Sequence, residues 1–419
     1  MATKKKTSKS AQPSSGANKL AKASVVLKQL FKDDSFSVQN DPDMLTKPLP
    51  HFSSGSTVID FVIGGAPNKN GISPCPGIPR GKIVQIWGAN HSGKTTVCLE
   101  AAAAVIAGGG VVSYIDWEYA IDPRYASHIL GVSVSDENHI MWSQPATLEE
   151  GFQICLTMAA AGVDLIVIDS VGSAVLKVVD ESALKDLGNG TQGAGIGGAA
   201  RAWGQFLPRL KKTLSRTGST VIAISQTRAK IGMTGYGGPS EDPQGGKAWP
   251  FYADLRFSLA KVKTYTAMLH DPLTNKRDKR AYAHEVKITI QKCKLAPSTN
   301  AKGTFYIRYG EGIDDLWSMV DVAKNYGLVK GSGWLTWKRA NGEEFKHQGQ
   351  DNFLAKLSED EALVHEFLAE VRPLLFSVRG ANVDLGSDED EDMDQDELLA
   401  MLEAGDDGDD DTGVFEMED

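Results

Sequence analysis

A glycine-rich run near residue 90 limits the folds open to this chain more than any other stretch does. Residues 88–95 read GANHSGKT and match the pattern GxxxxGK[ST] at every fixed position. The preceding KIVQIWG is apolar on both faces, which is typical of a buried parallel strand, and the following VCLEAAAAVIA is typical of a helix. A strand, a glycine loop and a helix in this order predict a P-loop nucleotide-binding core.

The glycines of this loop let consecutive backbone N–H groups turn toward phosphate oxygens, and the helix that follows adds its positive N-terminal end. We expect the Lys94 ammonium to reach the β- and γ-phosphates of ATP, and the Thr95 hydroxyl to bind Mg²⁺. The residues expected to hold the nucleotide are Gly88, Ala89, Asn90, His91, Ser92, Gly93, Lys94, Thr95 and Thr96.

Two other apolar runs end in carboxylates. The run LIVIDS places Asp169 at the end of a strand, where we expect it to hold Mg²⁺ together with Thr95. The run YIDWE places Asp116 and Glu118 at the end of another strand. ATP hydrolysis needs a base that aligns the attacking water, and both of these residues are candidates. The pattern alone does not choose between them.

Apolar strands and helical stretches alternate from residue 81 onward, which predicts an α/β fold around a central, mostly parallel sheet. Five further runs read as strands, namely VVSYID, HIMWSQ, VDLIVIDS, STVIAISQ and DLRFSLAKV. Residues 262–284 carry a polar DPLTN turn between two strands and predict a protruding hairpin. A smaller α/β segment is expected over residues 314–376.

Composition and periodicity divide the chain further. The predicted parts are a disordered basic N-terminus at 1–22, an N-terminal segment at 23–75, a core at 76–313, a C-terminal α/β domain at 314–380 and a disordered acidic tail at 381–419. The N-terminal segment is expected to open with a short amphipathic helix at 23–33.

The formal net charge of −10 hides an asymmetry. Of the 54 Asp and Glu residues, 17 lie from Asp388 to the end, where no Lys or Arg occurs, and the other 37 face 44 Lys and Arg in the rest of the chain. A mildly basic body with an acidic tail suggests a nucleic acid partner and a tail that competes for the same basic surface. The alternative is a tail that only keeps the protein soluble.

Four widely spaced cysteines form no CxxC pair and are expected to be reduced thiols of a cytoplasmic protein. They are Cys75, Cys98, Cys155 and Cys293. No run approaches the ~18 consecutive apolar residues that span a bilayer, so we expect no membrane partner. The lysine-rich N-terminus also lacks the apolar stretch of a secretory signal.

Eight landmarks occur along the chain: GKIVQIWG, the P-loop, YIDWEYAIDPRYA, LIVIDSVGS, AISQTRAKIG, GGKA, KCKLAP and YGEGI. With them the chain resembles the bacterial RecA recombinases over residues 26–375, most closely over residues 81–312. The resemblance implies a RecA-like P-loop NTPase core with a small N-terminal oligomerisation segment, a small C-terminal α/β domain and an acidic tail. It also implies a role in homologous recombination, DNA repair and the SOS response.

The resemblance assigns Glu118 as the base of ATP hydrolysis. Asp122 and Tyr125 match adenine-site positions, where the tyrosine would stack on the base and the aspartate would accept from its amino group. Gln226 matches the residue that senses the γ-phosphate and reports it to the loop that follows.

The resemblance further implies two DNA-binding loops, one after the LIVIDS strand and one after ISQTR. Two isoleucines match apolar wedges between base triplets, and basic residues match phosphate contacts that read no sequence. The implied DNA-binding residues are Ile196, Arg201, Arg228, Lys230, Ile231, Gly245 and Gly246.

Lys292 and Lys294 lie two residues apart on one strand, and therefore on one face, and they match a pair that reaches the ATP of a neighbouring protomer. Such a contact would make hydrolysis depend on assembly, as an arginine finger does. Phe251 matches an interface position. The chain departs from the family at Asn90, where an acid is usual, and at Pro250, where a lysine is usual.

The predicted function is ATP-dependent assembly of a homo-oligomeric helical filament on single-stranded DNA. Pairing and strand exchange with double-stranded DNA and DNA-stimulated ATP hydrolysis would follow. Two alternatives stay open. A hexameric helicase of the same superfamily would share Glu118 and Asp169 but not the lysine pair, and a recombination mediator would bind ATP with little turnover.

Overall fold

The computed structural model describes residues 47–65, 73–177, 197–229, 241–271, 275–296 and 301–376. The chain divides into two compact units at Leu49 and Pro50, and every described helix and strand belongs to the second unit. The predicted helix at 23–33, the basic N-terminus and the acidic tail lie outside the described residues. The predicted domain boundaries stay predictions.

Ten strands form one central sheet in the described part of the chain. They are β3 (Ile83–Gly88), β4 (Val112–Asp116), β5 (Ile140–Ser143), β6 (Leu165–Asp169), β7 (Thr220–Ala229), β8 (Glu241–Pro243), β9 (Leu255–Asp271), β10 (Lys276–Cys293), β11 (Lys302–Arg308) and β12 (Gly312–Ile313). In space the order is β12-β11-β10-β9-β3-β7-β6-β4-β5, with β8 beside β7. The six strands from β9 to β5 run parallel, as predicted, whereas the strands from β9 to β12 pair antiparallel.

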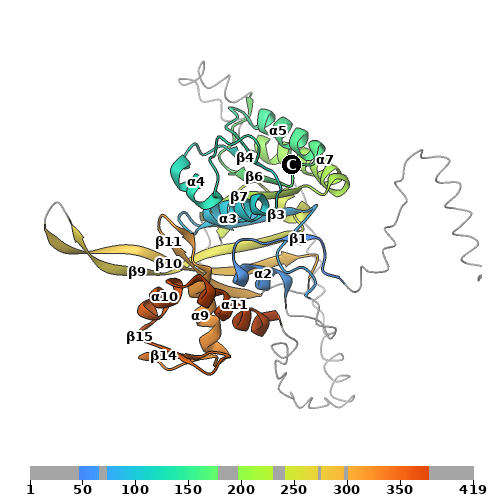
Figure 1. Ribbon diagram of the computed structural model, residues 1–419. Helices are drawn as coiled ribbons and strands as arrows, with labels where there is room; N and C mark the ends of the chain where they lie inside the picture. Colours follow the sequence, from blue (N-terminus) through green and yellow to red (C-terminus); the bar gives the residue numbers. More distant parts are fainter. Residues whose placement is uncertain are drawn as a thin grey trace, which may run out of the picture. The chain divides into compact units, whose positions relative to one another are not determined.

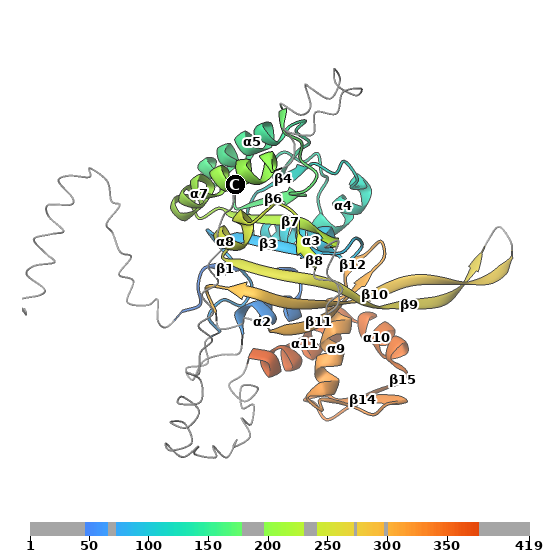
Figure 2. The same cartoon turned by 180° about the vertical axis from the view of Figure 1, so that it is seen from behind.

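The central parallel strands are buried on both faces, which explains why their sequences read as continuous apolar runs. In β6, Leu165 packs in the core that contains α3 (Lys94–Ala107). Its neighbour Ile166 packs in the core that contains α5 (Leu148–Ala161) and α7 (Gly198–Thr217), which lie side by side in Figures 1 and 2. Helices on both faces leave the carboxyl ends of these strands as the open edge of the sheet.

The strands β9 and β10 are 17 and 18 residues long and pair with each other antiparallel. They form the hairpin that the sequence predicted at residues 262–284. Figures 1 and 2 show its distal end extending beyond the other strands of the sheet. One of the bulges in their pairing lies between Ala281 and Ala283.

The chain after β12 contains the elements expected for a smaller α/β segment. They are α9 (Asp315–Asn325), the sheet of β13 (Val329–Lys330), β14 (Trp334–Lys338) and β15 (Glu344–Gln348), α10 (Gln350–Ser358) and α11 (Glu361–Phe376). Trp337, Phe353 and Phe367 are fully buried here, and the Phe367 ring meets each of the other two edge to face.

Part of the range predicted as the N-terminal segment belongs to the same compact unit as the core. The short strand β1 (His51–Phe52) pairs with β2 (Ile78–Pro79). The helix α2 (Thr57–Gly64) packs on β11 and α9. The backbone N–H and the hydroxyl of Thr57 both donate to the Asp315 carboxylate at 2.7 Å, which fixes α2 to the start of α9.

The cysteines are free thiols, as predicted, and three of the four are buried. Among the helices that the structure describes, none is both long enough and apolar enough to cross a membrane. A cytoplasmic location stays a prediction.

Candidate nucleotide-binding site

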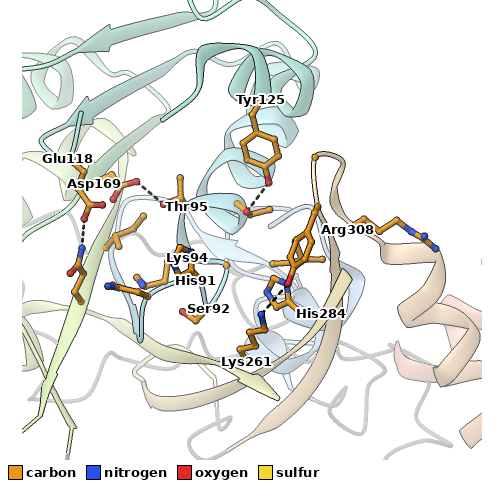
Figure 3. A pocket seen from close by; sticks show the side chains of 18 residues that line it. His91, Ser92, Lys94, Thr95, Glu118, Tyr125, Asp169, Lys261, His284 and Arg308 are labelled. Carbon is orange, nitrogen blue, oxygen red and sulfur yellow. Dashed lines mark hydrogen bonds between the residues drawn. The ribbon is translucent and has the colours of Figure 1, made fainter. Parts of the chain in front are cut away.

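The P-loop joins the end of β3 to the start of α3 at the open edge of the sheet. Gly93 has a left-handed backbone with φ of 91°, and a Cβ there would lie 2.3 Å from Cδ1 of Ile307, so only glycine fits. A pocket of about 600 Å³ borders the loop and is lined by every residue from Asn90 to Thr96 (Figure 3). The first-turn N–H groups of α3, which have no partner within the helix, therefore border this pocket.

Lys94 is held by the loop itself. Its ammonium donates to the carbonyl oxygens of Gly88 at 3.0 Å and Ala89 at 2.8 Å, and the residue is 8% exposed. Burial lowers the pKa of Lys94, and the nearby Asp169 and Glu118 carboxylates act in the opposite direction. The loop thus fixes one cation beside the start of α3.

Asp169 ends β6 next to the P-loop. Its Oδ2 accepts from the hydroxyls of Thr95 at 3.0 Å and Tyr114 at 2.9 Å, whereas its buried Oδ1 has no hydrogen-bond partner among the described residues. Burial, followed by the charge of Glu118, raises the pKa of Asp169 to about 6. A buried carboxylate oxygen with free lone pairs beside a threonine hydroxyl fits a cation that prefers oxygen ligands, such as Mg²⁺.

Asp116 and Glu118 follow each other closely but occupy different places. Asp116 is buried and accepts hydrogen bonds from the backbone of Glu118 and Tyr119 and from the Gln144 amide, each at 3.0 Å. Glu118 lines the pocket, where its Oε1 accepts from Nε2 of Gln226 at 2.7 Å (Figure 3). Of the two carboxylates, the structure therefore brings only Glu118 to the pocket, and Asp116 shapes the turn that carries it.

The two adenine-site candidates are also separated by the structure. Tyr125, on α4 (Pro123–Leu130), lines the pocket, and its hydroxyl forms a hydrogen bond of 3.0 Å with the Thr96 hydroxyl. Asp122 is the N-cap of α4 and pairs with Arg124 at 3.1 Å, and it does not line the pocket. Hydrogen bonds from Arg124 lower the pKa of Asp122.

Residues from the antiparallel half of the sheet complete the pocket, and the sequence did not predict them. The Lys261 ammonium on β9 donates to the hydroxyl of Tyr309 at 3.1 Å, and the His284 ring on β10 lies 5.3 Å from the Tyr309 ring. His284 is 4% exposed, and neither ring nitrogen has a hydrogen-bond partner among the described residues. Burial, together with the Lys261 charge, lowers the pKa of His284 to about 4. Only the landmark YGEGI pointed to this region, since it begins at Tyr309.

The described ends of the two predicted DNA-binding loops lie together. Gly246 packs against the start of α7 so closely that a Cβ on it would lie 2.7 Å from Cβ of Ala200. Gly245 and Gly246 have positive φ of 105° and 82°, and Arg201 is exposed on α7. The remaining candidates, namely Ile196, Lys230, Ile231 and the side chain of Arg228, lie outside the described residues.

One residue connects the pocket to these loop ends. The Gln226 side chain contacts Glu118, and the Gln226 carbonyl accepts from the Gln244 N–H at 2.9 Å. Gln244 directly precedes the glycine pair. A displacement of Gln226 would therefore act on both the pocket and the loop.

Lys292 and Lys294 lie near the end of β10 and do not line the pocket of their own chain. The Lys292 ammonium donates to the carbonyls of Pro250 at 2.6 Å and Phe251 at 3.1 Å, in the last turn of α8 (Ala248–Tyr252). Burial, followed by the Lys294 charge, lowers the pKa of Lys292 to about 8. Phe251 is 70% exposed beside them.

A P-loop between a buried strand and a helix, with carboxylates at the ends of two neighbouring parallel strands, defines a P-loop ATPase. The family model of the RecA N-terminal domain matches residues 23–314. Protein RecA of Gloeobacter violaceus is 34% identical over 366 residues, which cover 87% of this chain and 84% of that protein. Protein RecA of Sulfurimonas denitrificans is 33% identical over 361 residues, with 85% and 93% covered. The chain belongs to the RecA family of ATP-dependent DNA recombinases, and a hexameric helicase is not favoured.

Proposed function

We propose that this protein polymerises on single-stranded DNA with ATP and Mg²⁺, and exchanges the bound strand with one strand of a duplex. The observation that carries the proposal is the connection from the pocket to the loop glycines, through Glu118, Gln226 and Gln244. It gives bound ATP a physical route to the segments expected to contact DNA.

The phosphates of ATP would lie against the first turn of α3, where loop N–H groups and the Lys94 ammonium supply positive charge. Thr95 and Asp169 would hold Mg²⁺, which shields the charge of the β- and γ-phosphates. Tyr125 and His284 line the pocket on the side away from Glu118 in Figure 3. They would contact the base and the ribose. For Asp122 to accept from adenine, its Arg124 donor would have to be replaced by the amino group.

Glu118 would act as the base that aligns and deprotonates the attacking water. Its partner Gln226 would donate to the γ-phosphate. Because the same amide donates to Glu118 at 2.7 Å, a γ-phosphate that attracts it would also release the carboxylate for the water. We therefore assign the pair as one switch, which turns hydrolysis on and moves the loop start together.

DNA would be held by backbone N–H groups and cations on the two loops, with isoleucines as wedges between base triplets. The packing of Gly246 against Ala200 of α7, directly before the exposed Arg201, supports this role. The residues proposed for this role are Ile196, Arg201, Arg228, Lys230, Ile231, Gly245 and Gly246.

Lys292 and Lys294 would reach the ATP of a neighbouring protomer in the filament. Their position away from the pocket of their own chain supports this role, because neither lysine is among the residues that line that pocket. The exposed Phe251 would be covered in the same interface. Pro250 supplies no cation there, so this interface contact would be lost or would be made by Lys247 instead.

Negative-stain electron microscopy with single-stranded DNA and a slowly hydrolysed ATP analogue tests the proposal. We expect open helical filaments that extend the DNA, since a heterologous interface that does not close generates a helix. Closed rings would contradict the filament and the role of the lysine pair. A steady-state ATPase assay with and without single-stranded DNA tests the mediator alternative, which expects almost no turnover in either case.

A further inference from the structure

The distal half of the β9–β10 hairpin, residues 264–270 and 276–282, is called the arm. No third strand pairs with it in the described chain: β3 pairs with β9 only up to Ser258, and β11 pairs with β10 only up to Ala283. At about 3.3 Å per residue, the arm reaches about 25 Å from that point. Its root is next to the pocket, because Lys261 lies three residues before the arm on β9 and His284 two residues after it on β10, and both line the pocket.

One face of the arm carries only positive and uncharged side chains. Arg277 pairs with His270, and Lys279 pairs with Met268. Residues opposite each other, and residues two apart on one strand, share a face of a ribbon, so these four side chains lie together. All four are exposed, including Met268 at 59%. We call this the basic face.

The cations of the basic face are available for a partner. The side chains of Arg277 and Lys279 have no hydrogen bond and no ion pair among the described residues. On the opposite face, Arg280 and Asp278 approach each other at 3.9 Å. On one face of the arm, therefore, Asp278 offsets the charge of Arg280. On the basic face, no described carboxylate offsets the charges of Arg277 and Lys279.

We propose that the basic face is a binding surface for the phosphate backbone of double-stranded DNA. A two-stranded β-ribbon has the dimensions to enter a major groove. Arg277 and Lys279 stand about 7 Å apart along the strand and can meet separate phosphates, which position the duplex without reading its sequence. The site rests on the DNA-binding function proposed above and adds a contact outside the two loops.

The base of the arm lies at the nucleotide pocket, and this determines where a bound duplex would be held. Lys261 on β9 and His284 on β10 both line the nucleotide pocket, and β10 also carries Arg277 and Lys279. The duplex would therefore be presented near the nucleotide pocket, which the proposed function places at the boundary between protomers. Capture of the duplex and the exchange reaction are served by different surfaces of one chain.

The test compares full-length wild-type protein with the double variant R277A/K279A. Fluorescence anisotropy of a short labelled duplex, recorded over a series of salt concentrations with Mg²⁺ and a slowly hydrolysed ATP analogue, gives the salt slope of binding. We expect the slope to shrink by about 1.8, which corresponds to two lost phosphate contacts at about 0.9 each. Single-stranded DNA binding and the ATP turnover that it stimulates should be unchanged.

Two controls are matched to this variant. R277K/K279R keeps both charges and should retain the wild-type slope. Arg280→Ala removes a cation from the opposite face of the same arm and should leave the slope unchanged. Thermal unfolding of all variants should coincide with that of the wild type, because the changed side chains are exposed.

Three results would overturn the proposal. Equal salt slopes of wild type and R277A/K279A would remove duplex DNA from the basic face. Loss of filaments or of single-strand-stimulated ATPase in the variant would instead identify the arm as a contact between protomers. If the wild type itself bound neither single-stranded nor double-stranded DNA, the proposed function would fail with it, and this outcome is distinct from the other two.

Discussion

The Glu118 carboxylate and the Gln226 amide share a hydrogen bond of 2.7 Å inside the pocket, so the proposed base and the proposed phosphate sensor are in direct contact. Glu118→Gln preserves the size of the side chain but removes its capacity to accept a proton from water. We expect DNA-stimulated ATP turnover to fall about 10²- to 10⁴-fold, whereas ATP-dependent DNA binding persists. A phosphate-release assay measures the first quantity and anisotropy measures the second.

Asp116→Asn is the matched control, because Asp116 lies two residues away and accepts three hydrogen bonds in the turn before Glu118. Weakening these hydrogen bonds should lower the free energy of unfolding by about 1–3 kcal/mol. Turnover by the folded protein should fall far less than in the Glu118 variant. A Glu118→Gln protein that hydrolyses ATP at the wild-type rate would exclude Glu118 as the base.

His284 lines the pocket, and neither of its ring nitrogens has a hydrogen-bond partner in the part of the chain that the structure describes. His284→Phe keeps the aromatic contact with Tyr309 and removes the polar atoms. One net hydrogen bond contributes about 0.5–1.5 kcal/mol, so we expect the dissociation constant of ATP to rise about 2- to 12-fold. The change should be equal for ATP and ADP, because His284 is not part of the phosphate-binding loop. Displacement of a fluorescent nucleotide measures both; unchanged constants would mean that the imidazole only packs.

The residues of the site differ in how well the sequence could predict them, and the reason is the range of the interactions that place them. Lys94 and Thr95 follow from the loop pattern itself, and Asp169 from the end of an apolar run. Spacing could not separate Glu118 from Asp116, since hydrogen bonds in the turn decide which carboxylate faces the pocket. Lys261 and His284 were not predicted, because the pairing of the hairpin with β3, a strand about 170 residues earlier in the chain, brings them to the P-loop.

At the scale of elements, the packing of α5 fixes the turn that carries Glu118. Gly151 on α5 faces Trp117, which is 5% exposed, and a Cβ on Gly151 would lie 2.0 Å from Cζ2 of that ring. Gly151→Ala should therefore lower the free energy of unfolding by about 1–3 kcal/mol, as overpacking does. It should also reduce ATP turnover, because Trp117 cannot move without Glu118. Denaturant titration and the phosphate-release assay test the two effects.

Gly204 on α7 supplies the control for this substitution. A Cβ at Gly204 would meet nothing within 4 Å, so Gly204→Ala should be neutral or stabilise the protein by up to about 1 kcal/mol. Equal free energies of unfolding for the two alanine variants would contradict this, because they would show that Trp117 moves away from the added methyl group without loss of stability.

Regular elements were predictable where periodicity and composition act within one segment. The six parallel strands read as continuous apolar runs, and the hairpin was marked by its polar turn. The two strands that continue the sheet beyond this hairpin, β11 and β12, were not recognised, because the pairing of β10 with β11 and of β11 with β12 depends on residues that do not alternate strictly. The packing of α2 on α9 joins segments about 250 residues apart, and no local pattern records it.

At the scale of the whole molecule, the distribution of charge connects two features that are far apart in the sequence. The 17 acids from Asp388 to the end follow a body with more basic than acidic residues. The arm places Arg277 and Lys279, whose side chains have no partner among the residues that the structure describes, on one exposed face. An acidic segment and duplex phosphates would compete for such a surface, and the competition would weaken beyond a Debye length of about 8–10 Å at physiological ionic strength.

Truncation after Gly386 removes these 17 acids and should tighten duplex binding and lower the Mg²⁺ concentration that binding requires. The gain should diminish as salt is raised, since screening weakens the repulsion in the full-length protein. Superimposable titrations of the two proteins would leave the tail with a solubilising role alone. Repeating the truncation in R277A/K279A shows on which surface the tail competes with DNA. If the tail acts on the basic face, the truncation should increase duplex affinity less in R277A/K279A than in the wild type. The reason is that two changes that act on one surface do not add. An equal gain in both backgrounds would place the action of the tail on the two DNA loops instead of the arm.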